Sequence, residues 1–440
     1  MAMSLSPIGD DQRPTLDRPT LQQVLSDHQR FATSQPGGRR ALLSFHDLSD
    51  HDLSGRNLSE ADLTGAVMHR TLLPGAVLRR AALYGADLRL ANLDHADLSR
   101  ADLRGVCFRG ASLRGTRLIE ADIREAILTR YDRRRSGDPE LREVRPDFSS
   151  ADARGIDLSN ARVGQAYVVQ ADFSDAVLCG VNLRGADLRH TNFTGANLDR
   201  ADLSQANLAG ACFTGALLTG SVLDGARLDA ADFQGAILDP GVTDRIARRG
   251  ARTIQPTPPD ALPLLVQSHR LWLDSAGRRG ARADVSDRDL SDADLRALDL
   301  TALLAVRCRL VHARMHKAIL AMADLSFADL RGAGMTYADL RGINLTRACL
   351  SGADLRGANL GPLVSAHRPD RQWPVRLEGA RLIGTDLRGA RLRQASLTGA
   401  DLSEANLEGC DLEGAGLEGC VLPRPTPQST YTGTPAQVVP

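Results

Sequence analysis

The residues of this chain that could do chemistry fall into small, separate sets. Two histidine pairs, His46 with His51 and His312 with His316, have spacings at which two imidazoles can share a metal ion. Neither pair has a clear third ligand, so we favour the interpretation that these histidines are ordinary polar residues and not metal ligands. The sequence therefore predicts no metal and no cofactor.

The other reactive residue types also lack the partners that catalysis needs. Arg133, Arg134 and Arg135 with Ser136 could bind an anion or be phosphorylated, but such a run is typical of a solvated loop. The seven cysteines form no CxxC pair, and no GxSxG, phosphate-binding loop or Ser/His/Asp set stands out. The sequence predicts that the protein is not an enzyme and that its cysteines are reduced.

Most polar residues instead belong to a repeat that must be understood first. From Ala176 to Leu238 every fifth residue is Leu or Phe, with a small residue two places earlier. A period of five matches neither the 3.6 of a helix nor the 2.0 of a strand. The small residue and the Leu can both face inward on one short extended segment, since extended residues two apart point the same way. The remaining two residues, often ending in Gly, turn a corner.

Four phenylalanines give the number of segments in one turn of the chain. Within the apolar column, Phe173, Phe193, Phe213 and Phe233 are 20 residues apart, which is four five-residue segments. Met315 and Met335 repeat this spacing. We predict a four-sided coil with these Phe side chains stacked on one side of the core. Successive coils should rise by about 4.8 Å, the spacing of hydrogen-bonded strands.

The repeated motif A(D/N)LxG resembles the pentapeptide-repeat family over most of residues 41–422. The resemblance implies an all-β solenoid, a right-handed quadrilateral β-helix. Interruptions of the repeat then divide the chain. We expect a disordered N-terminus at 1–19, a capping helix and turn at 20–40, a first β-helix at 41–238 with a loop insertion at 129–147, a Pro-rich linker at 239–260, a second capping helix at 261–284, a second β-helix at 285–422 with an insertion at 361–376, and a disordered tail at 423–440.

The two expected helices look like copies of one another. His28 matches His269 and Phe31 matches Trp272 when the two segments are aligned, so the chain resembles a tandem duplication of helix plus β-helix. An uncapped β-helix end offers open strand edges. We predict that the helices cover the N-terminal ends of the two β-helices, with Phe31 and Trp272 over the first coil. For the two histidines, completing hydrogen bonds at the cap is favoured over ligand binding or a proton switch.

Charge and hydropathy restrict the classes of partner. The chain has 54 basic and 54 acidic residues, which favours neither direct nucleic-acid binding nor an anionic membrane surface. No apolar run spans a bilayer, and the N-terminus lacks an apolar signal core, so a cytoplasmic location is expected. A secretion signal without such a core remains open, as for an effector delivered into another cell. The outward Asp and Asn could line up cation sites, but neighbouring Arg residues favour a mutually neutralising surface.

The favoured function is a non-enzymatic structural or protein-interaction module, a rigid β-helical scaffold that binds an unidentified protein partner through its faces, insertions or capping helices. The alternative is a DNA-mimicking modulator of a type II topoisomerase (gyrase), which the family resemblance raises. That role implies a strongly acidic surface, whereas the repeats here carry many arginines. The acidic exception lies near the end of the chain, where the sequence has Glu404, Glu408, Asp411, Glu413 and Glu418. The sequence leaves the partner and the oligomeric state open.

Overall fold

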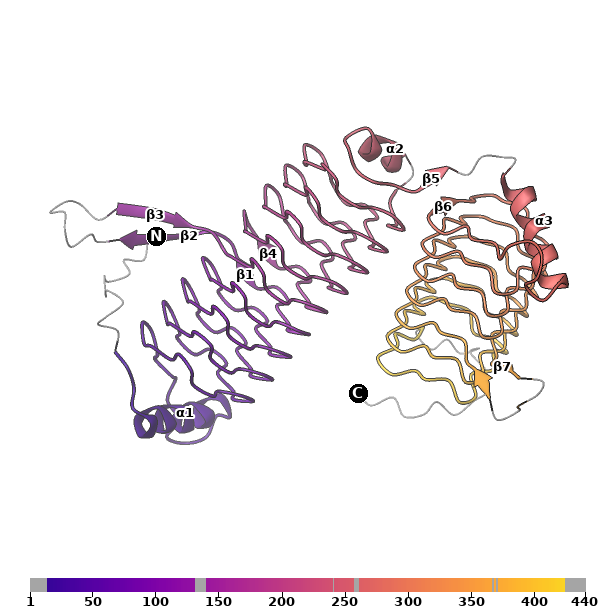
Figure 1. Cartoon of the computed structure of the whole chain (residues 1–440). Helices are drawn as coiled ribbons and strands as arrows, with labels where there is room; N and C mark the ends of the chain where they lie inside the picture. Colours follow the sequence, from indigo (N-terminus) through magenta and orange to yellow (C-terminus); the bar gives the residue numbers. More distant parts are fainter. Residues whose placement is uncertain are drawn as a thin grey trace. The chain divides into compact units, whose positions relative to one another are not determined.

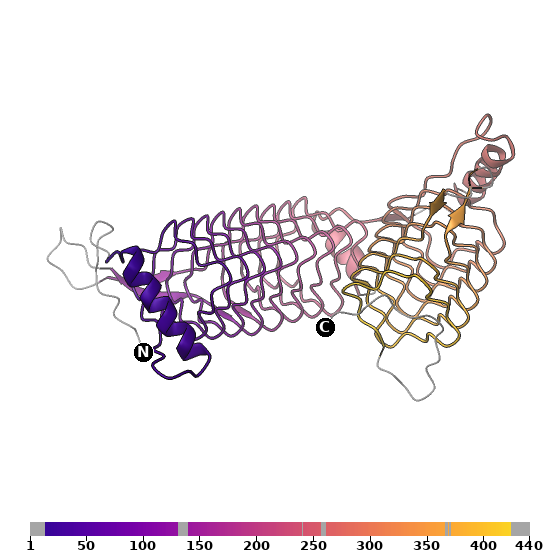
Figure 2. The ribbon, with the colours of Figure 1, turned by 90° about the horizontal axis from the view of Figure 1, so that it is seen from below.

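The computed structural model describes residues 14–130, 140–239, 241–256, 261–365, 368 and 371–423 (Figures 1 and 2). Its dominant feature is a register of parallel bridges between residues 20 positions apart, such as Asp62 with Ala82 and Ala82 with Asp102. The same register runs from Asp284 through Leu304 to Asp324. The prediction of four five-residue segments per coil is confirmed by this spacing.

Hydrogen bonds between coils follow from the extended segment on each side. Leu43 donates its backbone N–H to Asp62 O of the next coil at 2.7 Å, and Asp62 donates to Ala41 O at 3.0 Å. Corners close on themselves, as where Ala61 N–H donates to Leu58 O at 3.1 Å. Within the coils, the backbone N–H and C=O groups are thus hydrogen-bonded to the neighbouring coil or within a corner, and the bonding does not depend on a helix or a long strand.

The core is a narrow column of Leu, Ala and Phe side chains. Phe173, Phe193, Phe213 and Phe233 are each at most 4% exposed. Ring centroids lie 5.8 Å apart between Phe173 and Phe193, and 5.0 Å apart between Phe193 and Phe213. Phe108 and Phe148 also stack, at 5.1 Å. The 20-residue rule missed this last pair because an insertion separates its members.

The chain divides into two compact units, Met1–Asp232 with Ile237–Arg252, and Phe233–Ala236 with Thr253–Pro440. The first unit contains α1 (Arg18–Ala32), which lies across one end of its coils (Figure 2), and α2 (Val242–Ala247). It also has β1 (Asp122–Ile123) paired in parallel with β4 (Arg162–Val163). The second unit contains α3 (Ala261–Asp274) and the parallel pair β5 (Gln255–Pro256) and β6 (Arg288–Asp289).

Both insertions are antiparallel hairpins that leave the coil and return in register. In the first, β2 (Ala126–Arg130) pairs with β3 (Glu140–Val144), and Cys107 bridges to Asp147, 40 positions on. In the second, β7 (Leu363–Val364) pairs with β8 (Gln372–Trp373), and Asn344 bridges to Arg376, 32 positions on. Figure 1 shows the first hairpin extending away from the coils.

Three expected boundaries were wrong. Disorder does not extend to residue 19, because Thr15 bridges to Asp47 and α1 begins at Arg18 with the Asp17 side chain accepting from Thr20 N–H at 3.2 Å. The first repeat block does not reach 128, because β2 already begins at Ala126. Residues 239–260 are not only a linker, since α2 buries Ile246 completely there. Residues 1–13 and 424–440, where disorder was also expected, lie outside the described residues.

Candidate interaction surface

The outward side chains of the coils are organised by the corner that follows each extended segment. In Asp102-Leu-Arg104, Asp102 Oδ1 accepts from the backbone N–H of Arg104 at 3.3 Å and from Arg104 Nε at 2.8 Å. Arg104 Nη2 donates to the second carboxylate oxygen at 2.7 Å. The same Asp-x-Arg ion pair recurs at Asp87–Arg89, Asp122–Arg124, Asp152–Arg154, Asp187–Arg189, Asp294–Arg296, Asp329–Arg331, Asp339–Arg341, Asp354–Arg356 and Asp386–Arg388.

These pairs hold the carboxylates ionised. The Arg154 guanidinium, with a second one from Arg114, lowers the pKa of Asp152 to about 2. The hydrogen bond from Arg296 likewise lowers the pKa of Asp294 to about 2. Most of these side chains are partly exposed, and exposed ion pairs stabilise a fold little. Their main effect is to fix side-chain positions on the faces of the coil and to neutralise charge locally.

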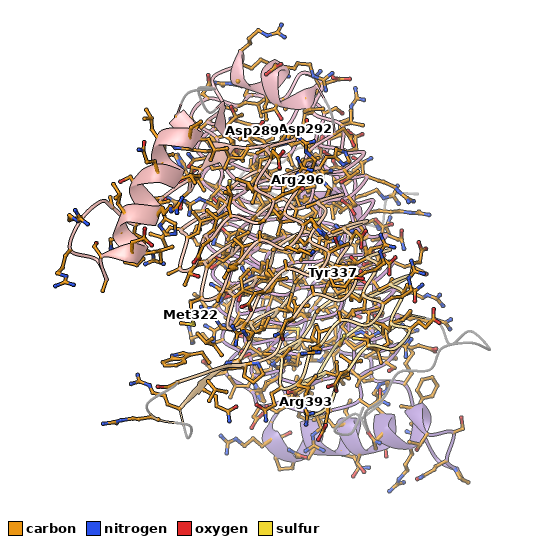
Figure 3. The ribbon with its side chains drawn as sticks, turned by 90° about the vertical axis from the view of Figure 1, so that its right-hand side faces the viewer. Asp289, Asp292, Arg296, Met322, Tyr337 and Arg393 are labelled. Carbon is orange, nitrogen blue, oxygen red and sulfur yellow. The ribbon has the colours of Figure 1, made fainter. Side chains whose placement is uncertain are left out.

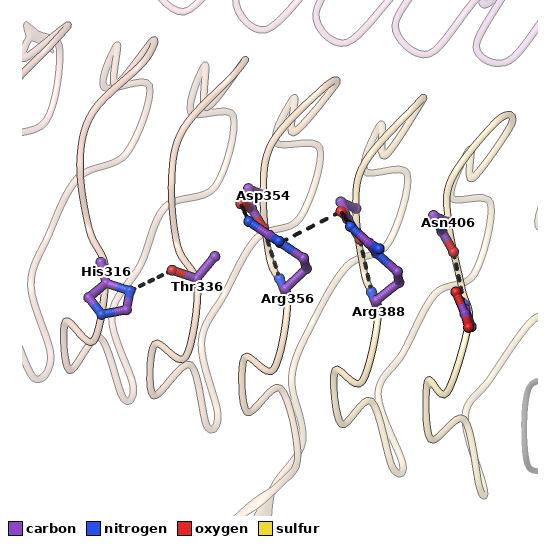
Figure 4. A network of polar contacts seen from close by, with 8 residues as sticks. His316, Thr336, Asp354, Arg356, Arg388 and Asn406 are labelled. Atoms are coloured by element: carbon purple, nitrogen blue, oxygen red, sulfur yellow. Dashed lines mark hydrogen bonds and ion pairs between the residues drawn. The ribbon is translucent and has the colours of Figure 1, made fainter.

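On one face of the second unit, polar contacts run along the coil axis (Figure 4). His316 Nδ1 lies 2.5 Å from Thr336 Oγ1. Further along, Arg356 pairs with Asp354 at 2.7 Å and reaches Asp386 of the next coil at 3.7 Å. The face therefore presents an ordered row of polar groups at the spacing of the coils.

An exposed aromatic side chain stands beside this row. Tyr337, labelled in Figure 3, is 63% exposed. Its ring meets the His316 ring edge-on, with 6.0 Å between centroids. It leans over the glycine of the next coil, since a Cβ built on Gly357 would lie 2.6 Å from the ring. Phe45 leans over Gly65 in the same way, at 2.6 Å. A large corner side chain is thus seated on the glycine 20 positions later.

The capping positions are occupied differently from the expectation in one respect. His28 and His269 are fully buried, and their Nδ1 atoms accept hydrogen bonds from Ala41 N–H at 3.0 Å and Ala283 N–H at 3.1 Å. Phe31 and Trp272 are only partly buried and stack on the two histidine rings, each at 5.6 Å. The histidines are therefore the buried, hydrogen-bonded contacts with the first coils, and the aromatic rings stack on them.

Apolar residues of the helices complete these contacts. Leu21 and Leu25 of α1 are at most 5% exposed. In the second unit, Leu262, Leu265 and Val266 of α3 pack against the core, where they line an apolar void of about 10 Å³ together with residues of the first coils. A space of that size, without polar lining, does not hold ordered water.

The remaining sequence candidates have local partners. His46 Nδ1 lies 3.0 Å from Ser44 O, and His51 Nδ1 lies 2.9 Å from Ser49 O. His312 leans over Gly332, away from the contact that His316 makes with Thr336. Within the described residues, no three His, Cys, Asp or Glu side chains gather as a metal site. Arg133 to Ser136 lie outside the described residues.

Three buried thiols are poorly placed for nucleophilic chemistry. Burial raises the pKa of Cys308 and Cys349 above the ordinary value, and it raises the pKa of Cys410 to about 12. A thiolate, the reactive form, is therefore disfavoured at these positions. Of the helices in the described segments, none is long and apolar enough to cross a membrane.

Two contacts on this surface were not visible in the sequence. The Tyr84 hydroxyl donates to Ile127 O at 2.9 Å and accepts from Ile127 N–H at 3.0 Å, so it anchors the β2–β3 hairpin to the coils. Arg393 pairs with Glu413 at 2.6 Å within the acidic end of the chain, where the sequence showed acidic residues alone. Each pair joins positions far apart in sequence, which only the coil register brings together.

Comparison with known proteins gives the family. Eight copies of the pentapeptide repeats family match this chain, and together they cover more than half of it, at residues 57–94, 73–110, 91–130, 171–210, 201–239, 308–347, 323–361 and 376–414. The chain belongs to the pentapeptide repeat family. The right-handed β-helix expected from the motif is the fold of this family. No curated protein matched the chain.

Several solved structures are similar to this pentapeptide repeat protein. HetL, involved in heterocyst differentiation regulation in the cyanobacterium Nostoc, is 20% identical with a TM-score of 0.18, over 94% of this chain and 100% of that chain. QnrB1, a plasmid-mediated fluoroquinolone resistance protein, is 20% identical with a TM-score of 0.25, over 48% and 91%. A protein of the Arabidopsis thaliana thylakoid lumen is 20% identical with a TM-score of 0.09, over 47% and 79%.

Proposed function

We propose that this protein is a non-enzymatic scaffold that binds an unidentified protein partner through its coil faces and its two hairpin insertions. The observation that carries the proposal is the combination of a backbone bonded coil to coil with outward Asp and Arg side chains that pair within many of the corners. Such a surface is ordered before binding, so little conformational entropy is lost when a partner docks. The anchored β2–β3 hairpin supplies a projecting contact.

We further infer two tandem β-helices, each preceded by a capping helix. This inference is supported by the matching histidine contacts of α1 and α3, and by a second correspondence before each helix. Thr15 bridges to Asp47 ahead of α1, and β5 pairs with β6 ahead of α3. A tandem duplication accounts for both correspondences. We propose a cytoplasmic location because all seven cysteines are thiols and not disulfide-bonded.

The insertions can be removed without breaking the register, which gives a direct test. Deleting 126–145 returns the Cys107 to Asp147 separation to 20, and deleting 363–374 does the same for Asn344 to Arg376. Each deletion variant and the full-length protein would be used to capture partners from extract of the native cell. We expect both variants to melt like the parent, and at least one to lose a partner that the parent retains. Equal capture by all three proteins would refute binding through the insertions.

The alternative, modulation of a gyrase by mimicry of DNA, has one specific observation in its favour. Glu404, Glu408 and Glu418 lie on the last coils among further acidic residues, as the sequence indicated. Against it, Arg393 neutralises part of this group, and the Asp-x-Arg pairs leave the faces without a uniform negative field. A supercoiling assay with gyrase at micromolar protein distinguishes the two, since a scaffold for another partner leaves supercoiling unchanged.

A further inference from the structure

The two cap histidines are buried titratable groups that the scaffold role does not use. His28 on α1 and His269 on α3 are both 0% exposed. Each ring stacks on an aromatic side chain of its own helix at 5.6 Å between centroids. Each Nδ1 accepts the backbone N–H that begins the first coil of its unit. The same arrangement therefore occurs twice, once at each capping helix.

The N–H groups of Ala41 and Ala283 need an acceptor from outside the coil. In later coils the equivalent amide closes a corner, as Ala61 N–H does on Leu58 O. Ala41 and Ala283 begin the first coil of their units, and their N–H groups donate to Nδ1 of His28 and His269 instead. An imidazole can accept at Nδ1 only when it is neutral and carries its proton on Nε2, because both ring nitrogens of the cation are donors. Protonation would place the Nδ1–H of the imidazolium opposite the backbone N–H of Ala41 or Ala283. The buried backbone donor would then have no acceptor, which is unfavourable.

The surroundings compensate the cation only in part. Both Nε2 atoms are buried without a hydrogen bond of good geometry, and the backbone groups of Ser59 and Thr301 raise the pKa of His28 and His269 by less than burial lowers it. The charged groups that face His28 are Arg40 and Glu60, one of each sign. Those that face His269 are Arg282 and Asp299, again one of each sign. Burial is the largest effect at both sites, and it lowers the pKa of both histidines below the ordinary value.

We propose that His28 and His269 are proton-sensitive latches, and that protonation of either imidazole releases its helix from the first coil. Release withdraws Leu21 and Leu25 from the first unit, or Leu262, Leu265 and Val266 from the second. The strand edges of the first coil are then open to pairing with another chain. The protein would thus expose new binding surface when the surrounding pH falls below about 6.5.

The sign of the pH dependence follows from the lowered pKa. A histidine in the released state has a pKa of about 6.5. The closed latch is fully stable above that pH and loses stability as pH falls toward the lower pKa of the closed state. Over that window, each fall of one pH unit raises the ratio of open to closed latch by at most about tenfold. The two latches act in separate units, so each provides an internal comparison for the other.

Hydrogen exchange of the full-length protein by mass spectrometry tests this directly. After correction for intrinsic exchange, opening of peptides from α1 and α3 should increase by up to about fivefold between pH 6.5 and 5.5, because the released histidine is already half protonated at pH 6.5. His28→Asn keeps an acceptor near Nδ1 but does not titrate, so it should abolish the increase in α1 alone. His269→Asn should do so in α3 alone. The controls are His190→Asn and His312→Asn, exposed corner positions with φ of 56°, which should leave both increases unchanged.

The proposal is overturned if the wild-type protein shows no acid-dependent opening, or if the opening persists in the matching single variant. A second measurement covers the case in which an Asn variant is already open at neutral pH. Titration of the labelled wild-type imidazoles by NMR should show both rings neutral, protonated on Nε2, with pKa values below about 6.5. An ordinary pKa, or a proton on Nδ1, at both sites would equally overturn it.

Discussion

Coupling between Phe193 and Phe213 is the energetic signature expected of the stacked core. Their rings lie 5.0 Å apart at an interplanar angle of 11°, and both side chains are at most 1% exposed. Phe193→Leu and Phe213→Leu should each cost about 1 to 2 kcal/mol, since Leu occupies this column elsewhere and fills most of the space. Loss of the ring pair adds about 0.5 to 1.5 kcal/mol beyond burial, and it is lost in full with either substitution.

The double-mutant cycle isolates that pair. Urea unfolding followed by circular dichroism should give a double variant about 0.5 to 1.5 kcal/mol more stable than the sum of the single losses predicts. The matched control is Phe108→Leu with Phe213→Leu, because Phe108 stacks on Phe148 in a different column several coils away. This pair should be additive within about 0.5 kcal/mol. Equal coupling in both cycles would refute stacking along one side of the coil.

Two further predictions concern corners and charge. Gly357→Ala should destabilise the second unit more than Gly352→Ala: both have left-handed φ, 65° and 68°, but only the former Cβ meets a ring, that of Tyr337. Adding Tyr337→Ala should remove the difference in melting temperature, and a persistent difference would contradict the seating of Tyr337. Asp152, with its pKa lowered to about 2, contributes stability that is present above about pH 4 and lost as pH falls through 2. Asp152→Asn should therefore reduce the fall of the urea unfolding midpoint between pH 4 and pH 2. An unchanged dependence of the midpoint on pH would contradict the pairing.

The coil itself could be predicted because its signal is repeated and geometric. The spacing of Phe173, Phe193 and Phe213 fixes both the length of a coil and the side on which these rings stack. Loss of the repeat pattern located the first insertion, after which the phase returns unchanged, and a phase shift located the second. Neither inference depends on the propensity of any single residue.

The features that escaped prediction depend on single residues or on distant contacts. Leu128 continues the apolar phase of the repeat, yet it lies in β2, because the chain pairs with β3 there instead of starting a new coil side. The α2 helix has one fully buried side chain, Ile246, and one such residue carries no periodicity. The aromatic residues of the caps looked like the natural core contacts, but the histidines also satisfy a backbone donor, which sequence patterns do not show.

The most direct test of the account is a cross-link across one coil. Cys212 forms a parallel β-bridge, a backbone pairing, with Asn192 of the preceding coil. Neighbouring strands lie about 4.8 Å apart, which is within the Cα–Cα range of about 4.4 to 6.8 Å that a disulfide needs. Asn207→Cys is the control, because residue 207 is closer in sequence but belongs to the previous side of the coil. Mild oxidation and peptide mapping should show a 192–212 disulfide in Asn192→Cys and none between 207 and 212. The opposite result would contradict the 20-residue coil and the scaffold that is built on it.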